Sequence, residues 1–169
     1  MSGAVLRRAT PQDVDAVMAL QAQAYGPALL EPHAVMARRL AADPGRCWLA
    51  QDAQGPCAYL LAHLSKLGQV TALGADFEPV ADPDSLHLHD LAVAPRAAGQ
   101  GLGARLVAQA LRGAADAGLA WSSLVAVQGS QAFWAARGYA PQAAYSPQAA
   151  TVLAGYGQAV YMARAVPPR

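Results

Sequence analysis

A strand, a glycine turn and a helix follow one another over residues 86–118, and this succession constrains the fold more than any other part of the chain. Residues 86–93 are mostly apolar and are stopped by Pro95, as expected of a β-strand. Glycines then alternate over residues 99–103, and apolar side chains recur at helical spacing as far as Gly118, a residue type that commonly follows a helix. The stretch predicts a strand–turn–helix unit whose backbone N–H groups are suited to bind an anion such as phosphate.

Length and composition indicate one domain over residues 1–169 and limit its partners. Of the 169 residues, 54% are apolar, which is enough for one hydrophobic core. No apolar run reaches about 18 residues and the first residues lack the layout of a signal peptide, so we expect a cytoplasmic protein that does not enter a membrane. The net charge of +1 argues against nucleic acid as a partner. Cys47 and Cys57 lack the spacing of metal ligands, so we expect buried thiols and no metal site.

The order of the expected elements predicts a mixed β-sheet with helices on both faces, in the α/β or α+β class. Strands are expected at residues 5–8, 47–51, 57–63, 86–93, 120–127 and 159–165, with a further extended piece from Tyr139. Helices are expected from 10–13 toward Tyr25, from Pro32 to about 43–45, from 102 to 118 and over 131–137, while 141–158 is interpreted as loose. Residues 65–84 show no period, and two interpretations stay open for them, a flap beside the substrate and a surface insertion.

The glycine turn can be compared with two known phosphate-binding patterns, and neither fits it fully. Gly99, Gly101 and Ala104 fit the G-x-G-x-x-A pattern of dinucleotide-binding folds. However, residues 95–98 separate the strand from the first glycine, and no acidic residue ends the next expected strand to bind a ribose. A nucleotide P-loop is excluded because no Gly-Lys-Ser/Thr sequence follows. A connection without a ligand would not need three glycines, whose ordering costs backbone entropy.

Two motifs in this order and spacing resemble the GCN5-related N-acetyltransferase (GNAT) superfamily. The first family motif is a strand ending in V-x-P, followed by Q/R-x-x-G-x-G/A at the start of a helix. It corresponds here to Leu91-Ala92-Val93-Ala94-Pro95 and then Ala98-Gly99-Gln100-Gly101-Leu102-Gly103. The second is a later helix of the form F-Y-x-x-x-G-F, here Phe133-Trp134-Ala135-Ala136-Arg137-Gly138-Tyr139. The resemblance covers nearly the whole chain and implies the acyl-CoA N-acyltransferase fold of this superfamily.

The resemblance implies transfer of an acetyl group from acetyl-CoA to a primary amine of an unidentified small molecule or peptide. The amine would attack the thioester directly and pass through a tetrahedral intermediate. An acyl-CoA-binding regulatory module with weak or no turnover is the alternative, because the tyrosine that often serves the family as general acid is Trp134 here. Members of the superfamily often form dimers, so the resemblance also makes a homodimer possible.

Three groups of residues are assigned to acetyl-CoA by the resemblance. The pantetheine arm is expected to pair with the central strand as an added strand does, and the Val93 N–H is a candidate for stabilising the thioester oxyanion. The pyrophosphate is expected on the backbone of the glycine turn, and the second motif is expected to border the cofactor. The residues concerned are Leu91, Ala92 and Val93 for the arm, Ala98, Gly99, Gln100, Gly101, Leu102 and Gly103 for the pyrophosphate, and Ser130, Phe133 and Trp134 for the border.

Departures from the family pattern affect this assignment. Ala98 stands where the family has Gln or Arg, which removes one side-chain contact to phosphate. Arg96 offers a second register, R-x-x-G-x-G, but we prefer the Ala98 register because it places the glycines nearest the start of the helix. For Trp134 two interpretations stay open, packing against the pantetheine arm and packing in the core.

Histidines on the central strand are the candidates for the general base that deprotonates the amine. His87 and His89 alternate along the expected strand and so face the same side, and His87 aligns with a glutamate base that some members carry. An imidazole has a suitable pKa near neutrality, while a hydrogen-bonded structural histidine is the alternative for each. Asp90 faces the other side, and His63 and His33 are weaker candidates.

The remaining candidate site residues are assigned from the family's layout. Tyr156 and Ser130 are candidates for the general acid toward the coenzyme thiolate, with water as an equal alternative, and Tyr156 is equally suited to packing. In the family the first helix–loop–helix walls the acceptor site, which implies Tyr25 and Glu31 as substrate-binding residues. For Glu31 we favour a role at the N-terminus of the second helix, with pairing to the acceptor ammonium as the alternative.

Overall fold

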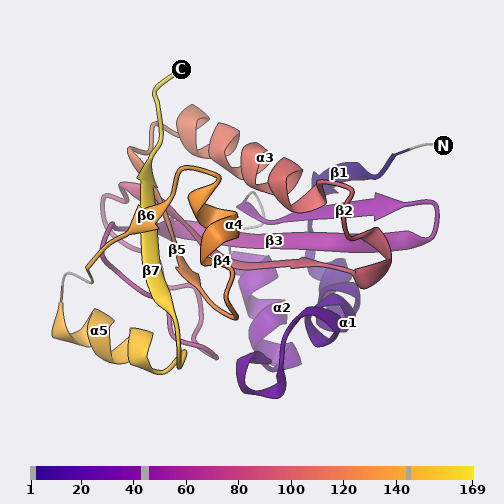
Figure 1. Ribbon diagram of the computed structural model, residues 1–169, viewed down its shortest axis with the longest axis horizontal. Coiled ribbons are helices and arrows are strands. Elements are labelled where there is room, and N and C mark those ends of the chain that lie inside the picture. The colour runs from indigo at the N-terminus through magenta and orange to yellow at the C-terminus, as the bar shows by residue number, and fades with distance from the viewer. Residues whose placement is uncertain (1–2, 43–45, 144–145) are drawn as a thin grey trace. The chain divides into compact units, whose positions relative to one another are not determined.

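The computed structural model describes residues 3–42, 46–143 and 146–169, and the chain divides into two compact units. The first unit combines Met1–Ala62 with Asp90–Ala110, and the second combines His63–His89 with Leu111–Arg169. The boundaries fall inside two strands and one helix, so β3 (Gly55–Ser65), β4 (Ser85–Val93) and α3 (Leu102–Asp116) each contribute residues to both units. These elements are labelled in Figure 1. The interpretation of residues 1–169 as a single domain stays a prediction.

The first unit is built on strands in the hydrogen-bonded order β1-β2-β3-β4. Their bounds are Val5–Arg8 (β1), Trp48–Asp52 (β2), Gly55–Ser65 (β3) and Ser85–Val93 (β4). β2 pairs antiparallel with both β1 and β3. The β2–β3 hairpin closes because Asp52 Oδ1 accepts the Gln54 N–H at 2.8 Å and Gly55 adopts a φ of +107°. Residues 57–62 of β3 are fully buried, so both faces of this strand are covered.

Helices of the first unit begin where the sequence carries start signals. They are α1 (Val14–Ala24), α2 (His33–Ala42) and the first turns of α3 (Leu102–Asp116), with short 3₁₀ turns at Pro11–Asp13, Pro27–Leu29 and Pro95–Ala97. Before α1, the Asp13 carboxylate accepts the Thr10 N–H at 2.8 Å and also accepts two N–H groups of Arg7 at 2.8 Å. The bond to Asp13 gives the Thr10 N–H an acceptor, which it would otherwise lack at the start of the helix.

The second unit carries the parallel part of the sheet, in the order β4-β5-β7-β6. The further elements are β5 (Trp121–Ala126), α4 (Gln131–Ala135), β6 (Ala140–Pro141), α5 (Pro147–Ala154) and β7 (Val160–Ala165). β4 pairs parallel with β5 from Ser85 to Leu88, and β7 pairs antiparallel with β5 and β6. The mixed sheet with helices that the sequence predicts is therefore confirmed.

The differences from the expected elements have local causes. Residues 141–158 contain the helix α5, which begins because Ser146 Oγ accepts the Ala149 N–H at 3.1 Å and Pro147 occupies the first helical position. The helix expected up to Gly118 ends at Asp116, and Gly118 takes a φ of +71° just beyond it. Residues 66–84 form no helix or strand. The expected end of the second helix at 43–45 lies outside the described residues.

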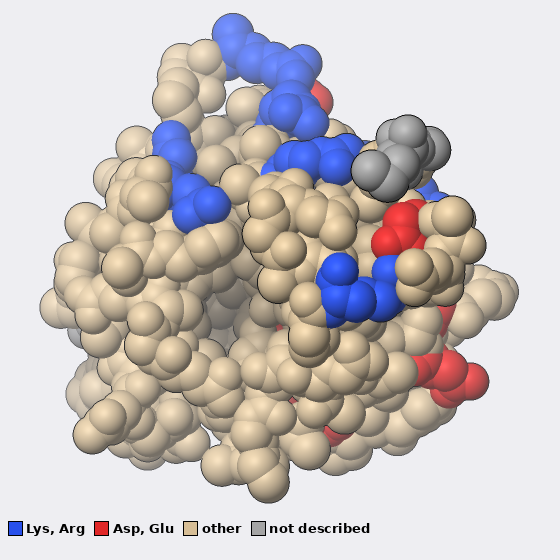
Figure 2. Space-filling view, turned by 45° about the vertical axis from the view of Figure 1, so that its right-hand side comes forward, with Lys and Arg blue, Asp and Glu red and all other residues tan. Residues whose placement is uncertain are grey.

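The cysteine thiols, the helix lengths and the surface charges add little to the prediction of a function. Cys47 and Cys57 are buried, as expected, and neither forms a disulfide; burial raises the pKa of the Cys57 thiol. Within the described ranges, no helix is both long and apolar enough to cross a membrane. Figure 2 shows a face on which uncharged residues cover most of the surface and charged side chains gather in small groups.

A buried ion pair fixes the connection between α1 and α2 in the first unit. Arg39 on α2 is fully buried, and its Nη2 lies 2.6 Å from Glu31 Oε2, which is nearly as buried. The backbone of Glu31 is also held by Gln21, whose Oε1 accepts the Glu31 N–H at 3.1 Å and whose Nε2 donates to the Glu31 carbonyl at 3.2 Å. Removing one partner of such a pair leaves the other charge buried without compensation.

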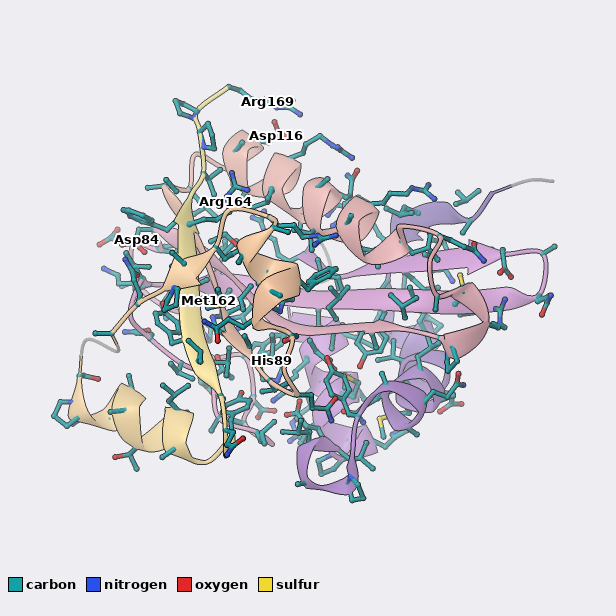
Figure 3. All side chains as sticks on the ribbon, viewed as in Figure 1. Asp84, His89, Asp116, Met162, Arg164 and Arg169 are labelled. Atoms are coloured by element: carbon teal, nitrogen blue, oxygen red, sulfur yellow. The ribbon has the colours of Figure 1, made fainter. Side chains whose placement is uncertain are left out.

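Glu31→Ala should therefore lower the free energy of unfolding by about 3 kcal/mol, because Arg39 would lose its carboxylate in a desolvated position. Urea denaturation followed by circular dichroism measures the change. Arg169→Gln is the matched control, since Arg169 forms an exposed pair with Asp116 (both labelled in Figure 3) and should cost about 0.5 kcal/mol or less. Equal effects of the two substitutions would contradict the prediction.

Candidate functional site

The glycine turn lies in the first unit, between β4 and α3. Gly99 and Gly101 adopt φ values of +78° and +71°, which other residues rarely tolerate, and a Cβ atom at either position would meet nothing within 4 Å. α3 begins at Leu102, so the N–H groups of its first turn have no acceptors within the helix. The turn thus presents backbone N–H groups in open space at the positive end of a 15-residue helix, an arrangement that fits a phosphate.

Arg96, just before the turn, is hydrogen-bonded to the β2–β3 hairpin. Its Nη1 donates to Asp52 Oδ2 at 2.5 Å, and its Nη2 donates to the carbonyls of Gly55 and Pro56 at 3.2 and 3.1 Å. The guanidinium group holds the pKa of the Asp52 carboxyl below its usual value. These bonds anchor Arg96 at the start of the turn. The preference for the Ala98 register stays a prediction.

One edge of β4 in the first unit is directed away from β3. The Ala94 N–H donates to the Cys57 carbonyl of β3 at 2.8 Å. Successive N–H groups of a strand point to opposite edges, so the N–H of Val93 points away from β3. On that same edge, the Tyr25 hydroxyl donates to the Leu91 carbonyl at 2.7 Å. The Val93 N–H therefore lies on the same edge as the Leu91 carbonyl, and Tyr25 lies beside that edge.

Two tyrosines and a carboxylate form a buried polar group on the α1 side of β4. The Tyr59 hydroxyl donates to Asp90 Oδ2 at 2.5 Å, and both residues are buried. Burial first, and the Asp90 carboxylate second, raise the pKa of the Tyr25 and Tyr59 hydroxyls well above the usual value. These hydroxyls therefore stay protonated near neutral pH and donate hydrogen bonds.

The second unit gathers three histidines and a phenylalanine. His63 stacks on Phe77 with ring centroids 4.1 Å apart and lies 5.5 Å from His87. His89 meets the edge of Phe77 at 5.4 Å and lies 6.4 Å from His87. His87 and His89 thus share a side of β4, in agreement with their alternation in the sequence (His89 is labelled in Figure 3). Among the residues that the structure describes, no His, Cys, Asp or Glu group is arranged to hold a metal ion.

The two strand histidines differ in environment. His87 is 1% exposed, and its Nδ1 lies 3.0 Å from Ser123 Oγ on β5. Burial, followed by the neighbouring His63 and His89, lowers the pKa of His87 well below its usual value, so this imidazole is neutral near pH 7. His89 is half-buried, which leaves it the more accessible of the two.

His63 is held at both ring nitrogens by residues that follow it in the chain. Its Nδ1 lies 3.0 Å from the Leu64 carbonyl and its Nε2 lies 2.9 Å from Thr71 Oγ1. The Thr71 carbonyl in turn accepts the hydroxyl of Tyr156, the residue proposed as a general acid. Residues 66–84 therefore pack against the histidine cluster within the second unit.

The second sequence motif forms an aromatic cluster. Trp134 is 7% exposed and packs edge-to-face against Phe133 and Tyr139, with centroids 4.9 and 5.5 Å apart. The Tyr139 hydroxyl lies 2.8 Å from Ser122 Oγ, and burial raises its pKa to about 12. These contacts place Trp134 in the core of the second unit. The expected contacts of Trp134, Ser130 and Phe133 with the cofactor stay predictions.

Sequence reasoning found some of these residues and missed others. It singled out the glycine turn, Val93, His87 and His89, but it placed Glu31 in the acceptor site or at a helix end, whereas the carboxylate contacts Arg39. Thr71 was missed because it lies in a stretch without periodicity and is adjacent to His63 only in three dimensions. Phe77 was missed for the same reason, whereas Tyr59 lies in an expected strand and its contact with Asp90 is made only in three dimensions.

The comparisons with known proteins agree with this geometry. The model of the acetyltransferase (GNAT) family matches residues 14–139, which is most of the chain. The chain belongs to the GNAT family. Members of this family are acyl-CoA-dependent acyltransferases. No curated protein matches the GNAT chain in sequence.

Solved structures with the same fold are distant in sequence. The GphF GNAT-like decarboxylase in complex with isobutyryl-CoA has a TM-score of 0.77 and 19% identity, over 96% of this chain and 100% of that one. The loading GNATL domain of CurA from Lyngbya majuscula has a TM-score of 0.75 and 14% identity, over 98% of each chain. The ribosomal-protein-S18-alanine N-acetyltransferase from Escherichia coli has a TM-score of 0.69 and 15% identity, over 98% and 96%. At these identities the likeness shows the fold.

The environment of His87 predicts a pH dependence of stability. Because its pKa is lower in the folded chain than in the unfolded chain, the unfolded chain binds a proton first as the pH falls below about 6.5. The free energy of unfolding should therefore fall below that pH by up to about 1.4 kcal/mol per pH unit. Urea denaturation of wild type and His87→Gln between pH 7 and pH 5 measures this; the variant should show a smaller slope. The exposed His33→Gln is the control, and a wild-type slope in H87Q would contradict the prediction.

Proposed function

We propose that this GNAT protein transfers an acetyl group from acetyl-CoA to a primary amine of a small molecule or peptide. The observation that carries the proposal is the glycine turn at the start of α3, together with the Val93 N–H that points away from β3. Membership of the family supports the choice of an acyl-CoA as the donor. The GphF structure is described as a complex with isobutyryl-CoA and another similar structure, Rv2747 from Mycobacterium tuberculosis, as a complex with CoA.

In this proposal the backbone supplies most of the donor site. N–H groups of the glycine turn and of the first turn of α3 hold the pyrophosphate. The N–H of Val93 stabilises negative charge on the thioester oxygen as the amine attacks. Acetyl-CoA, when bound, supplies an activated acyl group. Ala98 contributes only backbone here, so the site depends on dipoles and not on a side-chain cation at that position.

The base is assigned to the strand histidines, with His89 in contact with the amine. His89 is half-buried, whereas His87 is enclosed and bonded to Ser123, so His87 acts as a neutral partner that positions the cluster. A primary amine reaches the site as an ammonium ion and must lose a proton before it can attack. Tyr25, beside the open edge of β4, borders the acceptor in this arrangement.

Decarboxylation of an acyl-CoA is the second candidate, because the GphF structure is described as a GNAT-like decarboxylase. One feature of the histidine cluster favours this reaction: the neutral, buried imidazole of His87 and the apolar ring of Phe77 make an environment with little charge. Loss of CO₂ removes a charged carboxylate, and a poorly solvated site promotes that step. Release of CO₂ from malonyl-CoA without an amine would favour this candidate. Binding of CoA with neither reaction would favour the regulatory module.

The first test of the donor site is Gly101→Ala. Alanine at a φ of +71° is strained by about 1–2 kcal/mol, and its Cβ would enter the space that the phosphate needs. Calorimetry with CoA should show a Kd raised about tenfold or more. Gly113→Ala, further along α3, is the matched control: it should leave the Kd unchanged and add up to about 1 kcal/mol of stability. An unchanged Kd in G101A would contradict the assignment of the turn.

The test of the base is His89→Gln. The amide keeps hydrogen-bonding capacity but does not titrate, so kcat for amine acetylation should fall about 100-fold with little change in the KM for acetyl-CoA. Thiol release from acetyl-CoA, measured across a panel of primary amines, gives both values. His33→Gln, at an exposed histidine on α2, should keep wild-type kcat. Full activity of H89Q would contradict the assignment of this residue.

A further inference from the structure

The hydrogen bonds of His63 determine which of its nitrogens carries the proton. A carbonyl oxygen only accepts, so the 3.0 Å contact with the Leu64 carbonyl requires a hydrogen on Nδ1. In the neutral ring Nε2 then has a lone pair and no hydrogen. In that neutral form of the ring, the threonine hydroxyl donates the hydrogen bond of the 2.9 Å contact between Thr71 Oγ1 and Nε2. A hydroxyl whose proton points at an imidazole lone pair has the geometry of a proton-transfer pair.

The surroundings of the pair keep this geometry fixed. His63 is 5% exposed and is stacked on Phe77, which prevents rotation of its ring. Thr71 is half-buried, and its carbonyl accepts the Tyr156 hydroxyl, which fixes the loop where the threonine stands. The titratable groups that face the pair are His87 and His89 on β4 and Tyr156 after α5. His63 is therefore enclosed, while Thr71 is the more exposed member of the pair.

The stoichiometry of amine acetylation requires more than one proton transfer. A protonated primary amine and a thioester become an amide and a thiol, so nitrogen loses two protons, sulfur gains one and one is released. His89 accounts for one of the protons that leave nitrogen in the proposed function. Another acceptor close to the same cluster is needed for the other proton, and His63 lies 5.5 Å from His87 within that cluster.

We propose that Thr71 and His63 form a proton relay for the amine acceptor. Thr71 Oγ1 takes a proton from the acceptor nitrogen while its own hydroxyl proton passes to His63 Nε2. The ring becomes an imidazolium, whose Nδ1–H the Leu64 carbonyl continues to accept. The imidazolium then gives its Nε2 proton to water, and the departing thiolate takes its proton from water. Thr71 is the catalytic residue, and His63 acts through it. The inference rests on the proposed acetyl transfer and extends it to a residue pair outside the two family motifs.

Three variants test the relay: Thr71→Val, Thr71→Ser and Thr151→Val. Valine keeps the shape of threonine without the hydroxyl, so kcat for amine acetylation should fall about 100-fold, with the KM for acetyl-CoA changed less than about twofold. Serine keeps the hydroxyl and should restore kcat to within about tenfold of wild type. Thr151 lies on α5 and donates to the Pro147 carbonyl, so T151V should keep wild-type kcat. Circular dichroism confirms that each variant is folded.

Imidazole ¹⁵N NMR of the wild type provides a readout that does not depend on turnover. It should show neutral His63 with its hydrogen on Nδ1, and the Nε2 resonance should shift in T71V. A hydrogen on Nε2 would overturn the relay whatever the activity. Because this measurement uses the wild type, it tests the relay even if T71V does not fold. If T71V and wild type acetylate an amine equally well, the relay is wrong and acetyl transfer stands. If the wild type acetylates no amine, the proposed function fails and the relay fails with it.

Discussion

Hydrogen bonding between β3 and β4 takes up alternate backbone groups of β4 and leaves the intervening groups directed at the other edge. The bond from the Ala94 N–H to the Cys57 carbonyl fixes which groups these are. Because of this bond, the Val93 N–H points away from β3 and the Leu91 carbonyl can accept a hydrogen bond from Tyr25. A slip of one residue in this register would exchange both faces and both edges of the strand. The donor site proposed for this GNAT protein thus depends on a register that side chains alone do not specify.

Polar groups inside the first unit hold that register in place. Tyr59 and Asp90 join β3 to β4 by a buried hydrogen bond, and Tyr25 joins the end of α1 to the β4 backbone. The buried pair of Glu31 and Arg39 then fixes the connection that carries α1 into α2. Buried polar groups of this kind contribute more to a unique arrangement than to net stability when each has its partners. The Asp90 carboxylate and the two tyrosines thus help to define how β3, β4 and the end of α1 fit together in the first unit.

The sequence predicted most of the elements and the glycine turn because both depend on local patterns. Alternating glycines, a helix start at Thr10 and the spacing of His87 and His89 are readable without tertiary structure, and the structure agrees with each. α5 was missed although Ser146 and Pro147 form a start signal, because the flanking prolines and glycines favoured a loop. The contact of Thr71 with His63, and that of Glu31 with Arg39, joins segments whose pairing no local pattern specifies.

Because Arg96 is hydrogen-bonded to the hairpin, phosphate binding at the proposed site should depend less on salt concentration. A mobile guanidinium group that binds phosphate exchanges small anions, and its contribution weakens as salt screens the charge. Here the guanidinium is already neutralised by Asp52 and anchored by two carbonyls. A pyrophosphate held mainly by fixed backbone dipoles loses less of its binding energy to screening, because the donors are short-range and directional. The turn is thereby suited to bind its ligand with similar strength in dilute and in concentrated salt.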